Sequence, residues 1–119
     1  MKIYDLINRD IVCSCGRVHR CDIGTLSIGA GVLETLPQKL EDKTHILLVA
    51  DSNTFPLCGE RVKALLGERV ESVCLFPVAE GELLVPDEAS IAKIEGYLTE
   101  QTDFILGIGS GVINDLCKY

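Results

Sequence analysis

His45-Ile-Leu-Leu-Val-Ala50 is a continuous apolar run, and the polar residues Asp51-Ser-Asn-Thr54 follow it directly. A run of this kind is typical of a strand covered on both faces, as in a parallel sheet. Two later segments, Val70–Phe76 and Asp103–Ile108, show the same pattern less cleanly. The sequence therefore predicts three strands of a parallel sheet.

Helical patterns separate the three predicted strands. Residues 53–66 carry apolar side chains at helical spacing, and Asp87 can cap a second helix that ends near Thr99. Strands that alternate with helices are typical of α/β proteins. We therefore predict a Rossmann-like parallel sheet with flanking helices.

The first forty residues predict a different arrangement. Residues 17–28 suit a hairpin or an extended segment, with Gly24 as the expected bend. Gly29-Ala-Gly31 is then expected to begin a helix that reaches Leu40, and Pro37 should kink or break that helix.

The composition excludes several classes of protein. The 119 residues include 11 Lys and Arg against 18 Asp and Glu, a net charge of −7, whereas nucleic-acid-binding surfaces need clustered basic residues. No stretch approaches the about 20 apolar residues of a membrane span. The N-terminal residues lack the apolar core of a signal peptide, so we expect a cytoplasmic protein with reduced cysteines.

The end of the chain predicts that the protein is longer than 119 residues. Residues 112–119 have the pattern of a helix, yet the chain stops about two turns into it. We therefore expect an N-terminal fragment. Its cut edge should expose Val112, Ile113, Leu116 and Tyr119, which favours self-association into a homo-oligomer.

A glycine-rich turn is the sharpest candidate for a binding site. Gly107-Ile-Gly-Ser-Gly111 follows the third predicted strand and begins the last helix. Glycines let backbone N–H groups approach a phosphate, and a helix N-terminus favours an anion. The usual dinucleotide fingerprint does not fit, because Val112 occupies its third glycine position. A tight turn without a ligand is the alternative.

Asp51 is a second candidate, because it lies at the carboxyl end of the first predicted strand. A carboxylate there can accept both hydroxyls of an adenosine ribose. Alternatively, Asp51, Ser52 or Asn53 caps the next helix. The glycine turn should lie at the same edge of the sheet, where open α/β folds bind ligands.

Several motifs of the chain resemble the superfamily of iron-containing alcohol dehydrogenases, glycerol dehydrogenases and dehydroquinate synthases. In chain order they are Gly29-Ala-Gly31, Asp51-Ser-Asn-Thr54, and Gly109-Ser-Gly111 with Asp115 and Lys118. The turn of that superfamily reads approximately G-G-G-x-x-x-D-x-x-K, and Ser110 replaces its middle glycine here. Within the superfamily, residues 45–54 and 109–119 are most similar to the bacterial sn-glycerol-1-phosphate dehydrogenases.

The resemblance implies that residues 1–119 are the N-terminal part of a truncated NAD(P)-binding domain. Carried over by position, the residues that cradle the cofactor pyrophosphate are Gly109, Ser110, Gly111, Val112 and Ile113. Asp51 would hold the adenosine ribose and favour NAD over NADP, because a 2′-phosphate would meet its carboxylate. Asp115 would face the nicotinamide or the substrate, whereas Lys118 is left outside the site as a solvated charge.

The resemblance also implies a reaction and a metal. The whole enzyme would move a hydride between NAD(P)H and dihydroxyacetone phosphate, giving sn-glycerol 1-phosphate. In this family an Asp and two His of a later helical domain bind the catalytic zinc, nickel or iron, and His19 and His45 match neither histidine. The fragment alone should therefore be inactive. The alternatives are a stand-alone nucleotide-binding module without catalysis, or a sister activity such as glycerol oxidation or dehydroquinate synthesis.

Cys13-Ser-Cys-Gly-Arg-Val-His-Arg-Cys21 forms a third cluster. Thiolates and an imidazole at this spacing can ligate tetrahedral zinc, provided that the chain turns at Gly16. However, the pattern C-x-C-x3-H-x-C matches none of the common zinc frameworks, in which ligands come as two separated pairs. We favour reduced cysteines in a surface hairpin and keep zinc ligation by Cys13, Cys15, His19 and Cys21 as the alternative.

Overall fold

The computed structural model describes residues 2–118. They form two compact units, one that extends to Val32 and one that begins at Leu33. None of the helices in the described range has the length and apolarity needed to cross a membrane.

The N-terminal unit contains an antiparallel hairpin. A 3-10 turn, η1 (Ile3–Leu6), precedes β1 (Asp10–Val12), which pairs with β2 (Val18–Arg20). The expected N-terminal hairpin is thus confirmed, but its bend lies at Gly16 and not at Gly24. Gly16 adopts a left-handed φ of 83° that most residues avoid, and its N–H donates to the Cys13 carbonyl at 3.0 Å.

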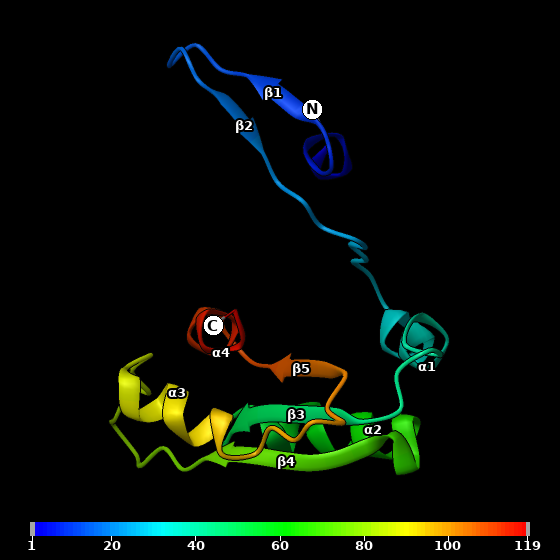
Figure 1. The fold of residues 1–119 in the computed structure, drawn as a ribbon, viewed down its shortest axis with the longest axis vertical. Coiled ribbons are helices and arrows are strands. Elements are labelled where there is room, and N and C mark those ends of the chain that lie inside the picture. Colours follow the sequence, from blue (N-terminus) through cyan, green and yellow to red (C-terminus); the bar gives the residue numbers. More distant parts are fainter. Residues whose placement is uncertain (1, 119) are drawn as a thin grey trace. The chain divides into compact units, whose positions relative to one another are not determined.

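The second unit contains a three-stranded parallel sheet. Its strands β3 (Ile46–Asp51), β4 (Val70–Phe76) and β5 (Phe104–Ile108) lie in the order β4-β3-β5 (Figure 1). Every residue of the central strand β3 is buried, as its continuous apolar sequence predicts. The predicted α/β architecture is therefore confirmed.

The helical elements from Val32 onward are η2 (Val32–Thr35), α1 (Leu36–Lys39), η3 (Phe55–Gly59), α2 (Glu60–Leu66), η4 (Gly67–Arg69), α3 (Glu88–Glu95) and α4 (Gly111–Cys117). Asp87 caps α3 as predicted, and its carboxylate accepts from the Ser90 N–H at 2.8 Å.

Two predicted helix boundaries are wrong. The helix expected from Gly29 begins only at Val32, because Gly29 and Gly31 both have positive φ. As expected, its pattern breaks near Pro37, which lies in the first turn of the short helix α1. The helix expected to end near Thr99 ends at Glu95, after which N–H groups bond three residues back in turns.

The helices of the second unit cover both faces of the sheet. Alternate β3 residues point to opposite faces, so Leu47 and Val49 pack with α3 and α4 while Ile46 and Leu48 pack with α1 and α2. The buried residues of the first face are Leu47, Val49, Cys74, Phe76, Ile94, Ile113 and Leu116.

The prediction that the last helix exposes an apolar edge is wrong for two of the four residues named. Ile113 and Leu116 of α4 are only 1% and 2% exposed, because they pack against the sheet. Val112 is half-buried, and Tyr119 lies outside the described residues.

Candidate functional site

The candidate site is a crevice at the carboxyl ends of β3 and β5. The chain passes from central β3 to β4 on one side and returns to β5 on the other side. Open α/β sheets bind ligands at such a switch point. The crevice has a volume of about 280 Å³, and its lining residues are Asp51, Asn53, Thr54, Val78, Glu82, Leu83, Leu84, Ser110 and Val112.

Asp51 ends β3 and is 8% exposed. Its Oδ1 atom accepts from the backbone N–H groups of Asn53 and Thr54, each at 2.8 Å. The carboxylate therefore closes the turn between β3 and η3. It does not cap the next helix as the alternative from the sequence had it, because the N-cap of η3 is Thr54. Because Asp51 also lines the crevice, contact with a ribose stays a prediction.

Thr54 joins the two strand ends that form the crevice. Its Oγ1 donates to the Ile108 carbonyl at the end of β5 at 2.9 Å and accepts from the Asp51 N–H at 3.1 Å. The sequence reasoning missed this role. A hydroxyl three residues after an aspartate is a local signal for such a turn, but its bond to β5 spans 54 residues.

Ser52 positions the loop after β4, which also lines the crevice. Its Oγ accepts from the Val78 N–H at 2.9 Å and lies 3.2 Å from the Val78 carbonyl, to which it donates. This contact positions the loop after β4, which contributes Glu82, Leu83 and Leu84 to the lining. No motif in the sequence pointed to these three residues.

The glycines of the turn differ in their surroundings. A Cβ at Gly109 would lie 2.6 Å from Cγ1 of Ile113, and one at Gly107 would lie 3.0 Å from Sγ of Cys117. These two glycines therefore allow α4 to pack on β5. At Gly111, by contrast, no atom beyond its chain neighbours and the backbone of its own helix lies within 4 Å of such a Cβ, so space is open beside the backbone.

The first turn of α4 presents backbone donors at this place. Ser110 is the N-cap and lines the crevice, and its carbonyl accepts from the Asn114 N–H at 3.1 Å. The N–H groups of Gly111, Val112 and Ile113 belong to the first turn, where a helix lacks intrahelical acceptors. The buried side chain of Ile113 leaves only its backbone for such a role.

The charged residues of the region are unevenly placed. Asp51 and Glu82 line the crevice, and its lining within the described chain includes no Lys or Arg. Asp115 and Lys118 are exposed, lie 3.4 Å apart between Oδ1 and Nζ, and are not among the lining residues. An anion in the crevice would thus depend on backbone donors.

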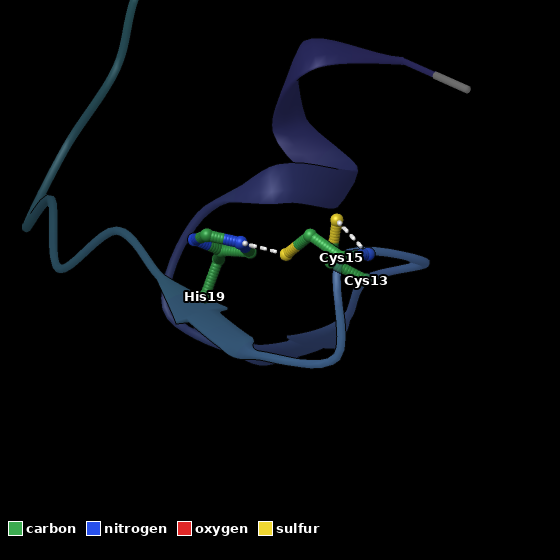
Figure 2. Close-up of side chains that lie close together, drawn as sticks. All are labelled: Cys13, Cys15 and His19. Carbon is green, nitrogen blue, oxygen red and sulfur yellow. Dashed lines mark hydrogen bonds between the residues drawn. The ribbon is translucent and has the colours of Figure 1, made fainter.

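A separate cluster lies at the turn of the N-terminal hairpin. Cys13, Cys15 and His19 hold their ligand atoms within 4.8 Å of one another, and Cys15 points toward the His19 ring (Figure 2). The N–H of Cys15 donates to Sγ of Cys13 at 3.5 Å, and this bond lowers the pKa of the Cys13 thiol. The fourth residue of the sequence pattern, Cys21, is not part of the cluster.

A parallel sheet with helices on both faces and a crevice at its switch point defines an open α/β protein, the class that binds ligands at this edge of the sheet. Residues 27–119 match the sequence profile of the iron-containing alcohol dehydrogenases, and the chain belongs to this family. The resemblance seen in the sequence is thereby confirmed.

The chain is similar in sequence to curated proteins that are named glycerol-1-phosphate dehydrogenase. The chain is 31% identical over 111 residues to the NAD(P)+ glycerol-1-phosphate dehydrogenase of Halalkalibacterium halodurans, covering 89% of this chain and 28% of that protein. It is 30% identical over 83 residues to the enzyme of the same name from Bacillus subtilis strain 168, covering 68% and 21%. The chain thus spans about a quarter of these relatives' lengths. No solved structure matches the chain significantly.

Proposed function

We propose that this chain is the N-terminal, NAD(P)-binding portion of an oxidoreductase that resembles glycerol-1-phosphate dehydrogenase. The whole enzyme transfers a hydride from NAD(P)H to the carbonyl carbon of dihydroxyacetone phosphate, and a proton completes sn-glycerol 1-phosphate. The names of the relatives support this reaction. We also propose a cytoplasmic location, where thiols stay reduced.

The observation that carries the proposal is the position of Asp51 and the glycine turn at one crevice. Backbone N–H groups at Gly109, Ser110, Gly111, Val112 and Ile113 would hold the cofactor pyrophosphate, since the space beside Gly111 is open. The carboxylate of Asp51 would accept from the ribose hydroxyls, and its charge favours NAD over NADP.

The residues of the crevice fit a dinucleotide but not a catalytic metal. A bound nicotinamide dinucleotide supplies the hydride, and the protein orients it. A zinc, nickel or iron site of the whole enzyme needs ligands beyond this crevice, because no His lines it within the described residues. We therefore propose that residues 1–119 alone have no dehydrogenase activity and that Asp115 acts only toward substrate or nicotinamide bound by the whole enzyme.

The test replaces Gly111 with Val in the gene product that carries this segment. The branched side chain enters open space, so the fold should persist, while NADH affinity should fall at least about tenfold because the pyrophosphate can no longer approach. Gly24→Val is the matched control, since a Cβ there also meets open space but lies in the N-terminal unit.

Calorimetric titration with NADH and turnover of dihydroxyacetone phosphate are the measurements. Lost affinity in Gly111→Val with normal affinity in Gly24→Val supports the proposal. Equal affinity in both variants would show that the turn is structural only, and absence of turnover by the intact enzyme would overturn the assigned reaction.

A further inference from the structure

The cluster at the hairpin turn has the geometry of a metal site. Sγ of Cys15 lies 3.2 Å from Nε2 of His19, and the ligand atoms of Cys13, Cys15 and His19 all lie within 4.8 Å. Bonds of about 2.3 Å to sulfur and about 2.0 Å to nitrogen place the ligand atoms of tetrahedral zinc about 3.5–3.8 Å apart. The three side chains therefore need only small adjustments to share one ion.

The backbone of the turn holds the two cysteines in place. The Cys13 N–H donates to the Arg17 carbonyl at 3.0 Å, and the Gly16 N–H returns to the Cys13 carbonyl at 3.0 Å. The Cys15 N–H points at Sγ of Cys13 (Figure 2). Donation from a backbone N–H to a metal-bound sulfur stabilises its negative charge and orients the ligand.

The two strands below the turn are braced by polar contacts. Asn8 accepts from the Ile23 N–H through Oδ1 at 2.9 Å and donates to the Ile23 carbonyl through Nδ2. The guanidinium of Arg20 forms two ion pairs: its Nη1 lies 3.3 Å from Oδ1 of Asp10, and its Nε lies 2.5 Å from Oδ1 of Asp22. These contacts support the pairing of β1 with β2, in which His19 of β2 lies opposite Ile11 of β1.

The hairpin lacks the apolar core that usually stabilises such a unit. None of residues 2–32 is buried, and the side chains of Val12 and Val18 are 85% and 61% exposed. A two-stranded hairpin without a core is marginally stable in water, and small units of this kind are commonly stabilised by a metal ion. Binding of an ion to preformed ligands would contribute folding free energy here.

We propose that the turn of the N-terminal hairpin binds a zinc ion through Sγ of Cys13, Sγ of Cys15 and Nε2 of His19, with water in the fourth position. Two thiolates and one imidazole suit zinc, which prefers sulfur and nitrogen ligands in tetrahedral geometry. Binding releases the two thiol protons to solvent. This site lies outside the crevice and is independent of the proposed dehydrogenase reaction.

Cobalt and zinc titrations of the reduced 119-residue chain test the proposal. One equivalent of Co²⁺ should give the near-ultraviolet thiolate-to-cobalt band and the intense visible bands of tetrahedral cobalt, and Zn²⁺ should abolish both. Cys13→Ser, Cys15→Ser and His19→Ala should each lower the affinity at least about tenfold. Cys21→Ser is the matched control, because Cys21 is exposed on the same hairpin but outside the cluster.

Circular dichroism of the second unit, which contains the buried core, shows whether each variant remains folded outside the hairpin. Retention of the cobalt bands by Cys21→Ser shows that a substitution in the hairpin does not by itself abolish binding. Absence of the thiolate band in the folded wild-type chain would overturn the site. Loss of affinity in Cys21→Ser equal to that in Cys15→Ser would overturn the assignment of water to the fourth position.

Discussion

Gly109 and Gly111 lie two residues apart in one turn, yet they serve different purposes. Gly109 lets Ile113 pack close to the end of β5, whereas Gly111 leaves open space at the start of α4. A sequence motif treats both glycines alike, because it contains no information on which neighbour approaches each Cα. The close contacts give Gly109 a packing role, whereas the open space at Gly111 is what the proposed pyrophosphate contact requires.

Gly109→Ala should therefore destabilise the protein, whereas Gly111→Ala should leave its stability nearly unchanged. The new methyl group at Gly109 would meet Cγ1 of Ile113 at 2.6 Å and Cβ of Ile113 at 2.9 Å. Overpacking of this kind typically costs about 1–3 kcal/mol. Urea unfolding of both variants measures the difference, and equal midpoints would contradict the packing role of Gly109.

The strands β3 and β5 are also joined at the ends opposite the crevice. Asp103, just before β5, accepts from the N–H groups of Thr44 at 2.9 Å and His45 at 3.0 Å, just before β3. The Asp103 N–H in turn donates to the His45 carbonyl at 3.0 Å. Chiefly because of the Thr44 N–H, the pKa of Asp103 lies below its ordinary value of 3.8.

This contact predicts an acid-dependent loss of stability. A carboxylate with a depressed pKa in the folded state stabilises the fold above pH 3.8, and the contribution disappears as the pH falls through the lower folded value. Asp103→Asn should be less stable than wild type at pH 7, and the gap should narrow below about pH 4. Unfolding midpoints from pH 7 to pH 3 measure the gap.

Asp42→Asn is the control for this pH series, because Asp42 is an exposed carboxylate beside Lys43. A gap between wild type and Asp103→Asn that stays constant with pH would show that hydrogen-bond geometry, and not ionisation, sets the effect.

The strands were easier to predict than the helices and loops. The apolar run of β3 is continuous because both of its faces are covered, so the run itself located the central strand within one residue at each end. The helix begins only after Gly31 because Gly29 and Gly31 have positive φ, and the pattern of apolar residues contains no information on backbone dihedral angles. The hydrogen bonds of Ser52 and Thr54 that shape the crevice join partners 26 and 54 residues away, and a local sequence pattern cannot predict such partners.

The sequence predicted the parts of the candidate site that adjoin strands but not the parts that lie in loops. Asp51 and the glycine turn adjoin strands, and strand order alone brings them together. Glu82, Leu83 and Leu84 come from an irregular loop whose path is set by tertiary contacts. At the hairpin, spacing indicated four possible ligands, whereas the turn at Gly16 brings only Cys13, Cys15 and His19 together.

At the scale of the whole chain, the buried side chains are concentrated in one of the two units. All buried apolar residues of the described chain lie between Leu40 and Leu116, in the unit that begins at Leu33. That unit therefore contains the elements that make a fold stable without help from the hairpin.

Deletion of residues 1–32 should leave the second unit folded. Its melting temperature should lie within about 4 °C of that of the intact chain in zinc-free buffer, a shift of about 1 kcal/mol or less. Thermal unfolding followed by circular dichroism measures the shift. An unfolded or strongly destabilised product would show that the hairpin supports the sheet.

The crevice is built entirely from residues between Asp51 and Val112, which lie at or just after the carboxyl ends of three strands that follow one another in sequence. Proteins fold N-terminal parts first as they emerge from the ribosome. The nascent chain can thus complete the crevice soon after α4 leaves the exit tunnel. The dinucleotide proposed for this crevice would then bind the newly made chain and favour its folded state by mass action.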